Sequence, residues 1–149
     1  MMNHAHRITA LLLLTFAAGC GASDEERHAQ ADGLAQTVLD LVAENNASRL
    51  YSEYGSTELR QQRDTEEWVE FIAGYSPKLG RPVEIRRTFG GIMKEKGVTV
   101  GDYEYTVTWE KASGTFLLKT RWRDGRWKLL GIGFKSIVPH TEAAEETSR

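Results

Sequence analysis

The chain has 149 residues, of which 40% are hydrophobic, and it carries 19 lysines and arginines against 21 aspartates and glutamates. This length fits one domain, and the near-neutral charge argues against a nucleic-acid-binding protein, which usually has a strongly basic domain or stripe. A single cysteine excludes an internal disulfide and any metal site that needs several cysteines.

The N-terminus has the sequence pattern of a secretion signal. Arg7 precedes the uncharged residues 8–18, and small residues follow them. A short positive start, an apolar stretch of this length and a small-residue end are typical of a signal peptide, and the stretch is too short to span a membrane. The sequence therefore predicts a signal peptide over residues 1–19.

The end of this segment, Ala17-Ala18-Gly19-Cys20, resembles the lipobox of bacterial lipoproteins, with Ala17 where leucine is commoner. The resemblance implies a diacylglycerol on Cys20, cleavage before it, and acylation of the new amino terminus. Residues 20–24 would then be the lipidated cysteine and a short tether. Because Gly21 follows the cysteine instead of aspartate, the sorting habit of enteric bacteria indicates the outer membrane, facing the periplasm. The alternative is an ordinary signal peptide that leaves Cys20 as a free thiol.

The first half of the remaining chain has helical periodicity. Apolar residues spaced by three and four predict a helix over residues 24–45, and a shorter helix is expected over 47–54. Asp64, with Glu67 three residues later, has the pattern of a helix start. Pro77 is expected to end that helix, because the residue before a proline avoids helical geometry.

After Gly80 the period changes to two, which predicts strands over residues 83–89, 102–109, 116–123 and 127–138. Residues 90–101 are expected to form a loop flanked by glycines, with a short extended piece at 98–100. Asp124-Gly125 predicts a two-residue hairpin turn that places Trp122 opposite Trp127. A four-residue turn at 111–114 would place Trp109 opposite Phe116. The domain spans residues 25–139, and residues 140–149 are predicted to be a disordered acidic tail.

Helices followed by an antiparallel meander indicate an α+β fold. Six motifs then resemble small secreted bacterial proteins of unknown function with a cystatin-like or nuclear-transport-factor-two-like fold. The resemblance covers residues 34–137 and implies N-terminal helices packed on a curved four-stranded antiparallel sheet, with a cone-shaped cavity open at one end. It implies no activity, because such a fold hosts enzymes and non-enzymes. A cystatin inhibitory hairpin, Gln-x-Val-x-Gly, is absent. The motifs are Ser48-Arg49-Leu50-Tyr51, Thr65-Glu66-Glu67-Trp68, Leu79-Gly80, Arg86-Arg87, Gly101-Asp102-Tyr103 and the seven residues 125–131.

The predicted inner face of the sheet is aromatic. Four of its side chains, Tyr103, Tyr105, Trp109 and Trp122, are candidates for binding a ligand in the cavity, although the same residues would serve equally as core. A catalytic alternative pairs Asp40 with Tyr103 or Tyr105 for proton transfer on a small ring compound. The histidines after the signal peptide, His28 and His140, lie near opposite ends of the chain, so neither a metal site nor a cofactor is predicted.

The predicted outer face carries an apolar patch of Leu117, Leu130, Ile132 and Phe134. If these side chains stay outside, they mark a surface for a homodimer or an envelope partner. A bulge near Gly131 would instead turn Ile132 and Phe134 into the core. The sequence thus predicts a lipid-anchored, non-catalytic envelope domain that binds a small ligand or a protein. The alternative is a small-ring isomerase or lyase.

Overall fold

The computed structural model describes residues 21–141; the predicted signal peptide, Cys20 and residues 142–149 lie outside this range. Helices come first in the chain and strands follow, which confirms the α+β class. Within the described residues, no helix is long and apolar enough to cross a membrane. The elements are α1 (Asp24–Ala43), α2 (Ala47–Arg49), the π-helix η1 (Leu50–Tyr54), α3 (Thr57–Gln62), α4 (Thr65–Leu79), β1 (Pro82–Glu95), β2 (Val98–Trp109), β3 (Ala112–Arg123) and β4 (Arg126–Pro139).

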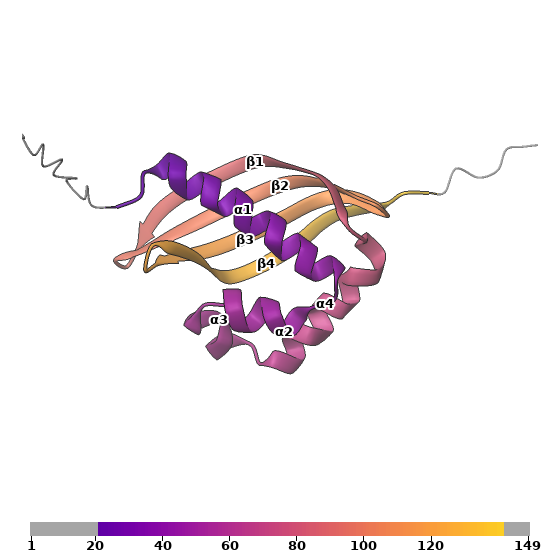
Figure 1. Cartoon of the computed structure of the whole chain (residues 1–149), viewed down its shortest axis with the longest axis horizontal. Helices are drawn as coiled ribbons and strands as arrows, with labels where there is room; N and C mark the ends of the chain where they lie inside the picture. The colour runs from indigo at the N-terminus through magenta and orange to yellow at the C-terminus, as the bar shows by residue number, and fades with distance from the viewer. Residues whose placement is uncertain (1–20, 142–149) are drawn as a thin grey trace, which may run out of the picture.

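The four strands form one antiparallel sheet in the order β1-β2-β3-β4. Helix α1 crosses one face of this sheet, which is called the inner face, and the shorter helices gather beside β4 (Figure 1). The start of α1 lies at the same end of the molecule as the β1–β2 and β3–β4 turns, whereas the β2–β3 turn lies at the other end (Figure 1).

Helix α1 starts with a reciprocal cap that fixes its first turn. The hydroxyl of Ser23 accepts a hydrogen bond from the backbone N–H of Glu26, and the carboxylate of Glu26 accepts one from the N–H of Ser23. Its buried stripe then packs on the sheet. The stripe comprises Ala31, Leu34, Ala35, Val38, Leu39, Leu41 and Val42.

The prediction that Pro77 ends its helix is wrong, because α4 continues to Leu79 and stops at Gly80, whose φ of 72° favours glycine. Pro77 lies in the last turn, where contacts from other elements hold the backbone. The hydroxyl of Ser76 donates to the Ala43 carbonyl, and the ammonium of Lys111 donates to the Pro77 carbonyl. The structure also adds a helix that the periodicity did not predict, α3, capped by Ser56.

Residues 90–101 are not a loop. They form a hairpin in which β1 and β2 continue to a two-residue turn at Lys96-Gly97, where both residues have positive φ. Gly90 and Gly91 are strand residues in this hairpin. A Cβ at Gly90 would lie 3.1 Å from the ring of Tyr103, so this glycine leaves room for the aromatic side chain on the neighbouring strand.

The β2–β3 turn comprises only Glu110-Lys111, so the predicted pairing of Trp109 with Phe116 is wrong. Phe116 lies opposite Tyr105, which precedes Trp109 by four residues. A shift by an even number of residues keeps every side chain on its predicted face, because side chains alternate with period two. The predicted pairing of Trp122 with Trp127 across the β3–β4 turn is confirmed.

A bulge in β4 reverses the predicted orientation of its second half. Leu129 pairs with Thr120 and Gly131 with Lys119, which leaves Leu130 as the extra residue. Ile132 and Phe134 therefore lie opposite Leu118 and Phe116 on the inner face and pack against the core. The prediction that these two residues belong to an outer apolar patch is therefore wrong.

Candidate functional site

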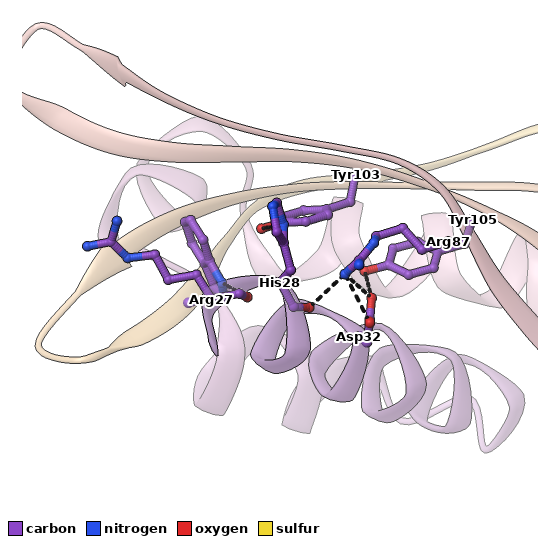
Figure 2. A network of polar contacts seen from close by, with 7 residues as sticks. Arg27, His28, Asp32, Arg87, Tyr103 and Tyr105 are labelled. Carbon is purple, nitrogen blue, oxygen red and sulfur yellow. Dashed lines mark hydrogen bonds and ion pairs between the residues drawn. The ribbon is translucent and has the colours of Figure 1, made fainter. Parts of the chain in front are cut away.

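A polar cluster joins α1 to the sheet and contains both tyrosines singled out from the sequence (Figure 2). The carboxylate of Asp32 accepts a hydrogen bond of 3.0 Å from the hydroxyl of Tyr105 and one of 3.0 Å from the guanidinium of Arg87. The same guanidinium donates to the backbone carbonyl of His28 at 3.1 Å. One carboxylate therefore connects α1 with β1 and β2.

The neighbouring turn of α1 extends this cluster toward the β3–β4 hairpin. The Nδ1 atom of His28 lies 3.2 Å from the hydroxyl of Tyr103. The indole N–H of Trp127 donates to the carbonyl of Arg27 at 2.8 Å, and the Arg27 guanidinium lies 5.1 Å from the centre of the Trp122 ring. The first two turns of α1 are thus attached to β1, β2 and the β3–β4 hairpin at this end of the sheet.

Burial of the two hydroxyls controls their acid–base chemistry. Desolvation raises the pKa of Tyr103 to about 12, and the nearby Asp32 adds to the increase while Arg87 opposes it. Desolvation also raises the pKa of Tyr105, reinforced by the charge and the hydrogen bond of Asp32. Both hydroxyls therefore keep their protons to a higher pH than an exposed tyrosine does, and Tyr105 donates to Asp32, which suits a structural clamp.

Asp40, the predicted catalytic carboxylate, is exposed and accepts a hydrogen bond from Gln36 on its own helix. The structure brings Tyr103 and Tyr105 together with Asp32 and His28 instead. The sequence held one signal for this arrangement. His28 and Asp32 are four residues apart and so share one face of the helix, beside the buried stripe.

The aromatic side chains predicted to bind a ligand fill the space under α1. Tyr103, Tyr105 and Trp109 are at most 2% exposed. Trp122 is half-buried and packs edge-on against Trp127, with ring centres 5.0 Å apart. Neither Asp32 nor Tyr105 lines the larger hollows of the described surface, which lie elsewhere on the sheet.

One hollow of about 620 Å³ lies between α4 and the end of β4, and is called the β4–α4 hollow. Its floor is apolar: the rings of Tyr75 and Phe134 have their centres 4.4 Å apart, and Ile137 lies beside them. Cationic side chains surround it. Its lining residues are Tyr75, Lys78, Lys111, Phe134, Lys135, Ser136, Ile137 and Pro139.

The three lysines differ in what they contact. Lys135 forms an ion pair with Glu104, with Nζ 3.1 Å from Oε1. Lys111 donates to the backbone carbonyl of Pro77, which leaves its charge without a carboxylate partner among residues 21–141. Lys78 is exposed and forms no ion pair within the same part of the chain. Two positive charges therefore remain available at the rim.

A second bulge in β4 shapes this hollow. Ser136 and Ile137 both oppose Gly114, and Ser136 has a φ of 55°, which is strained for a residue with a side chain. A Cβ at Gly114 would lie 2.6 Å from Cδ1 of Ile137 and 3.0 Å from the carbonyl oxygen of Ser136. The glycine thus permits a bend that places Ser136 and Ile137 in the wall of the hollow.

The outer face of the sheet has two further hollows with apolar side chains in their lining. Phe89 and Leu117 line a hollow of about 520 Å³ together with Gly131 and Gly133. Leu130 lines a separate hollow with Val98 and Val100, near the ion pair of Arg121 with Glu58. Of the predicted outer patch, Leu117 and Leu130 therefore remain on this face.

Within residues 21–141 no group of three or more histidine, cysteine, aspartate or glutamate side chains could hold a metal ion. Comparison of the chain with protein-family models and with curated proteins found no match.

Proposed function

We propose that this protein is a lipid-anchored domain of the bacterial cell envelope that binds a ligand without catalysis, and that the β4–α4 hollow receives the ligand. A long helix across a four-stranded antiparallel meander also supports assignment to the cystatin-like or nuclear-transport-factor-two-like folds (Figure 1). The observation that carries the proposal is the hollow, with its aromatic floor and its two lysines that lack carboxylate partners in the described chain.

The chemistry of the hollow favours one class of ligand. A volume of about 620 Å³ lies within the usual range of small-molecule sites, and an apolar floor with a few polar groups is their common composition. Tyr75 and Phe134 would contact an apolar body. Lys78 and Lys111 would attract an anionic head group. We therefore expect an amphipathic anion.

The position of the hollow agrees with a membrane anchor at Cys20. Only Gly21, Ala22 and Ser23 separate this cysteine from the capped start of α1, so the turn end of β1 and β2 would face the membrane (Figure 1). Lys111 and Pro139 lie at the opposite end of the sheet. The hollow would thus open away from the bilayer.

The catalytic alternative has weaker support. Asp40 does not reach a tyrosine, and Asp32, which does, is paired with Arg87. Both oxygens of Asp32 already accept hydrogen bonds from Arg87 or Tyr105, and Asp32 lines neither of the two larger hollows described above, so no substrate site lies beside it.

The anchor is tested by labelling with radioactive palmitate in a bacterial host and by membrane fractionation. The protein with residues 1–149 is expected to incorporate label and to sediment with membranes, whereas Cys20→Ser is expected to lose the label. Equal labelling of the two proteins would contradict the anchor.

Ligand binding is tested by calorimetry on residues 21–149 with two probes of equal chain length, dodecanoate and dodecyltrimethylammonium. Dodecanoate is expected to bind, and the double variant Lys78→Gln, Lys111→Gln to weaken it about tenfold or more, since charge-assisted contacts are lost. Lys94→Gln, an exposed change on β1, is the matched control. Equal binding of the cationic probe, or no effect of the double variant, would overturn the assignment of the hollow.

A further inference from the structure

Strand β1 forms an edge of the sheet, and its outer edge has no strand beside it within the described residues. The other edge differs. Gly55 forms a bridge with Leu129 of β4, and the N–H of Ser56 donates to the Leu129 carbonyl at 2.9 Å. The chain therefore covers part of the β4 edge and leaves a 14-residue strand open at β1. An open edge presents unpaired backbone groups to any further strand.

The open strand is also unusually apolar for a surface element. Five large hydrophobic side chains are exposed in residues 21–141, and three of them lie on β1. They are Val83, Phe89 and Met93, with exposed fractions of 69%, 54% and 43%. Charged side chains, proline and β-bulges usually protect such edges. A bulge at Thr88 precedes residues 89–93, and these five residues contain none of the three.

We propose that two copies of this protein pair through β1, antiparallel, with Gly91 on the twofold axis. In this register Phe89 of each copy lies opposite Met93 of the other, and Gly90 lies opposite Ile92. Phe89 and Met93 share the outer face of the sheet, because the β2 residues opposite them, Glu104 and Val100, lie an even number of positions apart.

The side chains are complementary under a twofold rotation, which a symmetric dimer interface requires. A large residue meets a large residue on either side of the axis, and a methionine sulfur beside an aromatic ring is a favourable contact. The segment that is symmetric about Gly91, residues 89–93, contains no charged group, so the pairing opposes no like charges.

Gly91 explains why the axis falls there. The Phe89 ring already extends over this glycine, since a Cβ at position 91 would lie 3.3 Å from the ring tip. Two such rings would therefore meet above the paired glycines. The result is an eight-stranded sheet with one continuous outer face. This dimer does not depend on the ligand proposed for the β4–α4 hollow.

The paired segment is short, so we expect a dimer with a dissociation constant in the micromolar range or weaker. Attachment of both copies to one membrane would raise their effective concentration and favour pairing.

Sedimentation of residues 21–149, which contain the whole described core, tests the association. A monomer–dimer equilibrium is expected. Met93→Lys places a charge opposite Phe89 in both copies and should raise the dissociation constant about tenfold or more. Val138→Lys, an exposed valine on β4, is the control and should leave it unchanged. A monomer at every concentration up to the millimolar range, or equal effects of the two variants, would overturn the proposal.

A disulfide tests the register. Residues 21–149 contain no cysteine, so Gly91→Cys introduces a single thiol at the predicted axis. The exposed Phe89 ring must rotate away from position 91 to make room for it. Mild oxidation should convert this variant to a covalent dimer much faster than Thr106→Cys, an exposed position on β2. Equal rates for the two variants would contradict pairing about Gly91.

Discussion

Asp32 has a structural role larger than its ion pair suggests. Its side chain is 46% exposed and that of Arg87 is 34% exposed, so solvent screens the attraction between their charges. The hydroxyl of Tyr105 is different, because the residue is only 1% exposed and has no access to bulk water. The hydrogen bond from Tyr105 to Asp32 should therefore contribute more than the ion pair.

Removal of this hydrogen bond gives a residue-scale prediction. Asp32→Ala leaves the Tyr105 hydroxyl buried without a partner and should lower the free energy of unfolding by about 2 kcal/mol. Tyr105→Phe removes the hydroxyl itself, so no buried donor is left without a partner, and the variant should cost less, about 1 kcal/mol. Urea unfolding measures both.

The double variant and a control complete this test. Asp32→Ala combined with Tyr105→Phe should cost less than the sum of the two, because the unpaired hydroxyl no longer exists. Tyr51→Phe, which removes a half-exposed hydroxyl that water can replace, should change stability by less than about 0.5 kcal/mol. Strict additivity would mean that the hydrogen bond does not form.

The sequence singled out Asp40 as the carboxylate near the tyrosines, whereas the structure places Asp32 there, and this difference has a physical origin. Both carboxylates flank the buried stripe of α1, so periodicity alone treats them equally. The choice depends on how the helix is rotated and how far along the sheet it sits. The positions of Arg87 and Tyr105 decide this, and they belong to strands far away in the sequence.

At the scale of elements, the strands could be predicted where side chains alternate without interruption. The two-residue turn at Asp124-Gly125 carries its own signal, and the prediction of its register is confirmed. Glu110-Lys111 has neither glycine nor asparagine, so the sequence does not reveal a turn at these two residues. Gly90 and Gly91 looked like a loop because their role, to accommodate two aromatic rings, depends on side chains that local periodicity does not reveal.

The bulge at Leu130 could be anticipated only as one of two alternatives. Without it, Gly131 and Gly133 would face α1 and Phe134 would face solvent. With it, Phe134 packs against four aromatic rings, and this burial of apolar area favours the bulge. The rings belong to Phe71, Tyr75, Trp109 and Phe116.

The effect of the bulge can be measured with two identical substitutions on opposite faces. Phe134→Ala should lower the free energy of unfolding by about 3 kcal/mol, because it removes a ring from the aromatic cluster. Phe89→Ala, at a side chain 54% exposed on the outer face, should cost less than about 1 kcal/mol. Fluorescence-detected urea unfolding at submicromolar protein keeps dimer formation out of the comparison. Similar costs for both would contradict the orientation of β4.

At the scale of the whole molecule, one core joins the helices to the sheet. Buried residues of α1, α4, β2, β3 and β4 contact each other without a second cluster in the described chain. A domain of this size with one core is expected to unfold in a single transition. Protonation of a buried group at the α1–sheet contact should therefore change the stability of the entire domain.

The two inner tyrosines make this coupling visible at alkaline pH. In the unfolded chain a tyrosine loses its proton near pH 10, whereas the folded-state pKa of Tyr103 is about 12 and that of Tyr105 is also raised. Between these values the native state holds protons that the unfolded state has released. Their contribution to stability is thus complete below about pH 10 and is lost as the pH rises toward 12 and beyond, by up to about 1.4 kcal/mol per pH unit for each tyrosine.

Urea unfolding of the wild type at pH 8, 10 and 11 should therefore show stability that falls above pH 10. Tyr103→Phe should decrease this slope, and the further change Tyr105→Phe should decrease it again, because each variant removes one group that binds a proton more tightly in the folded state. Deprotonation of lysines also occurs in this range, but it is common to all three proteins and cancels in their comparison. Equal slopes for the wild type and the double variant would mean that water reaches both hydroxyls, and that α1 does not seal the inner face of the sheet.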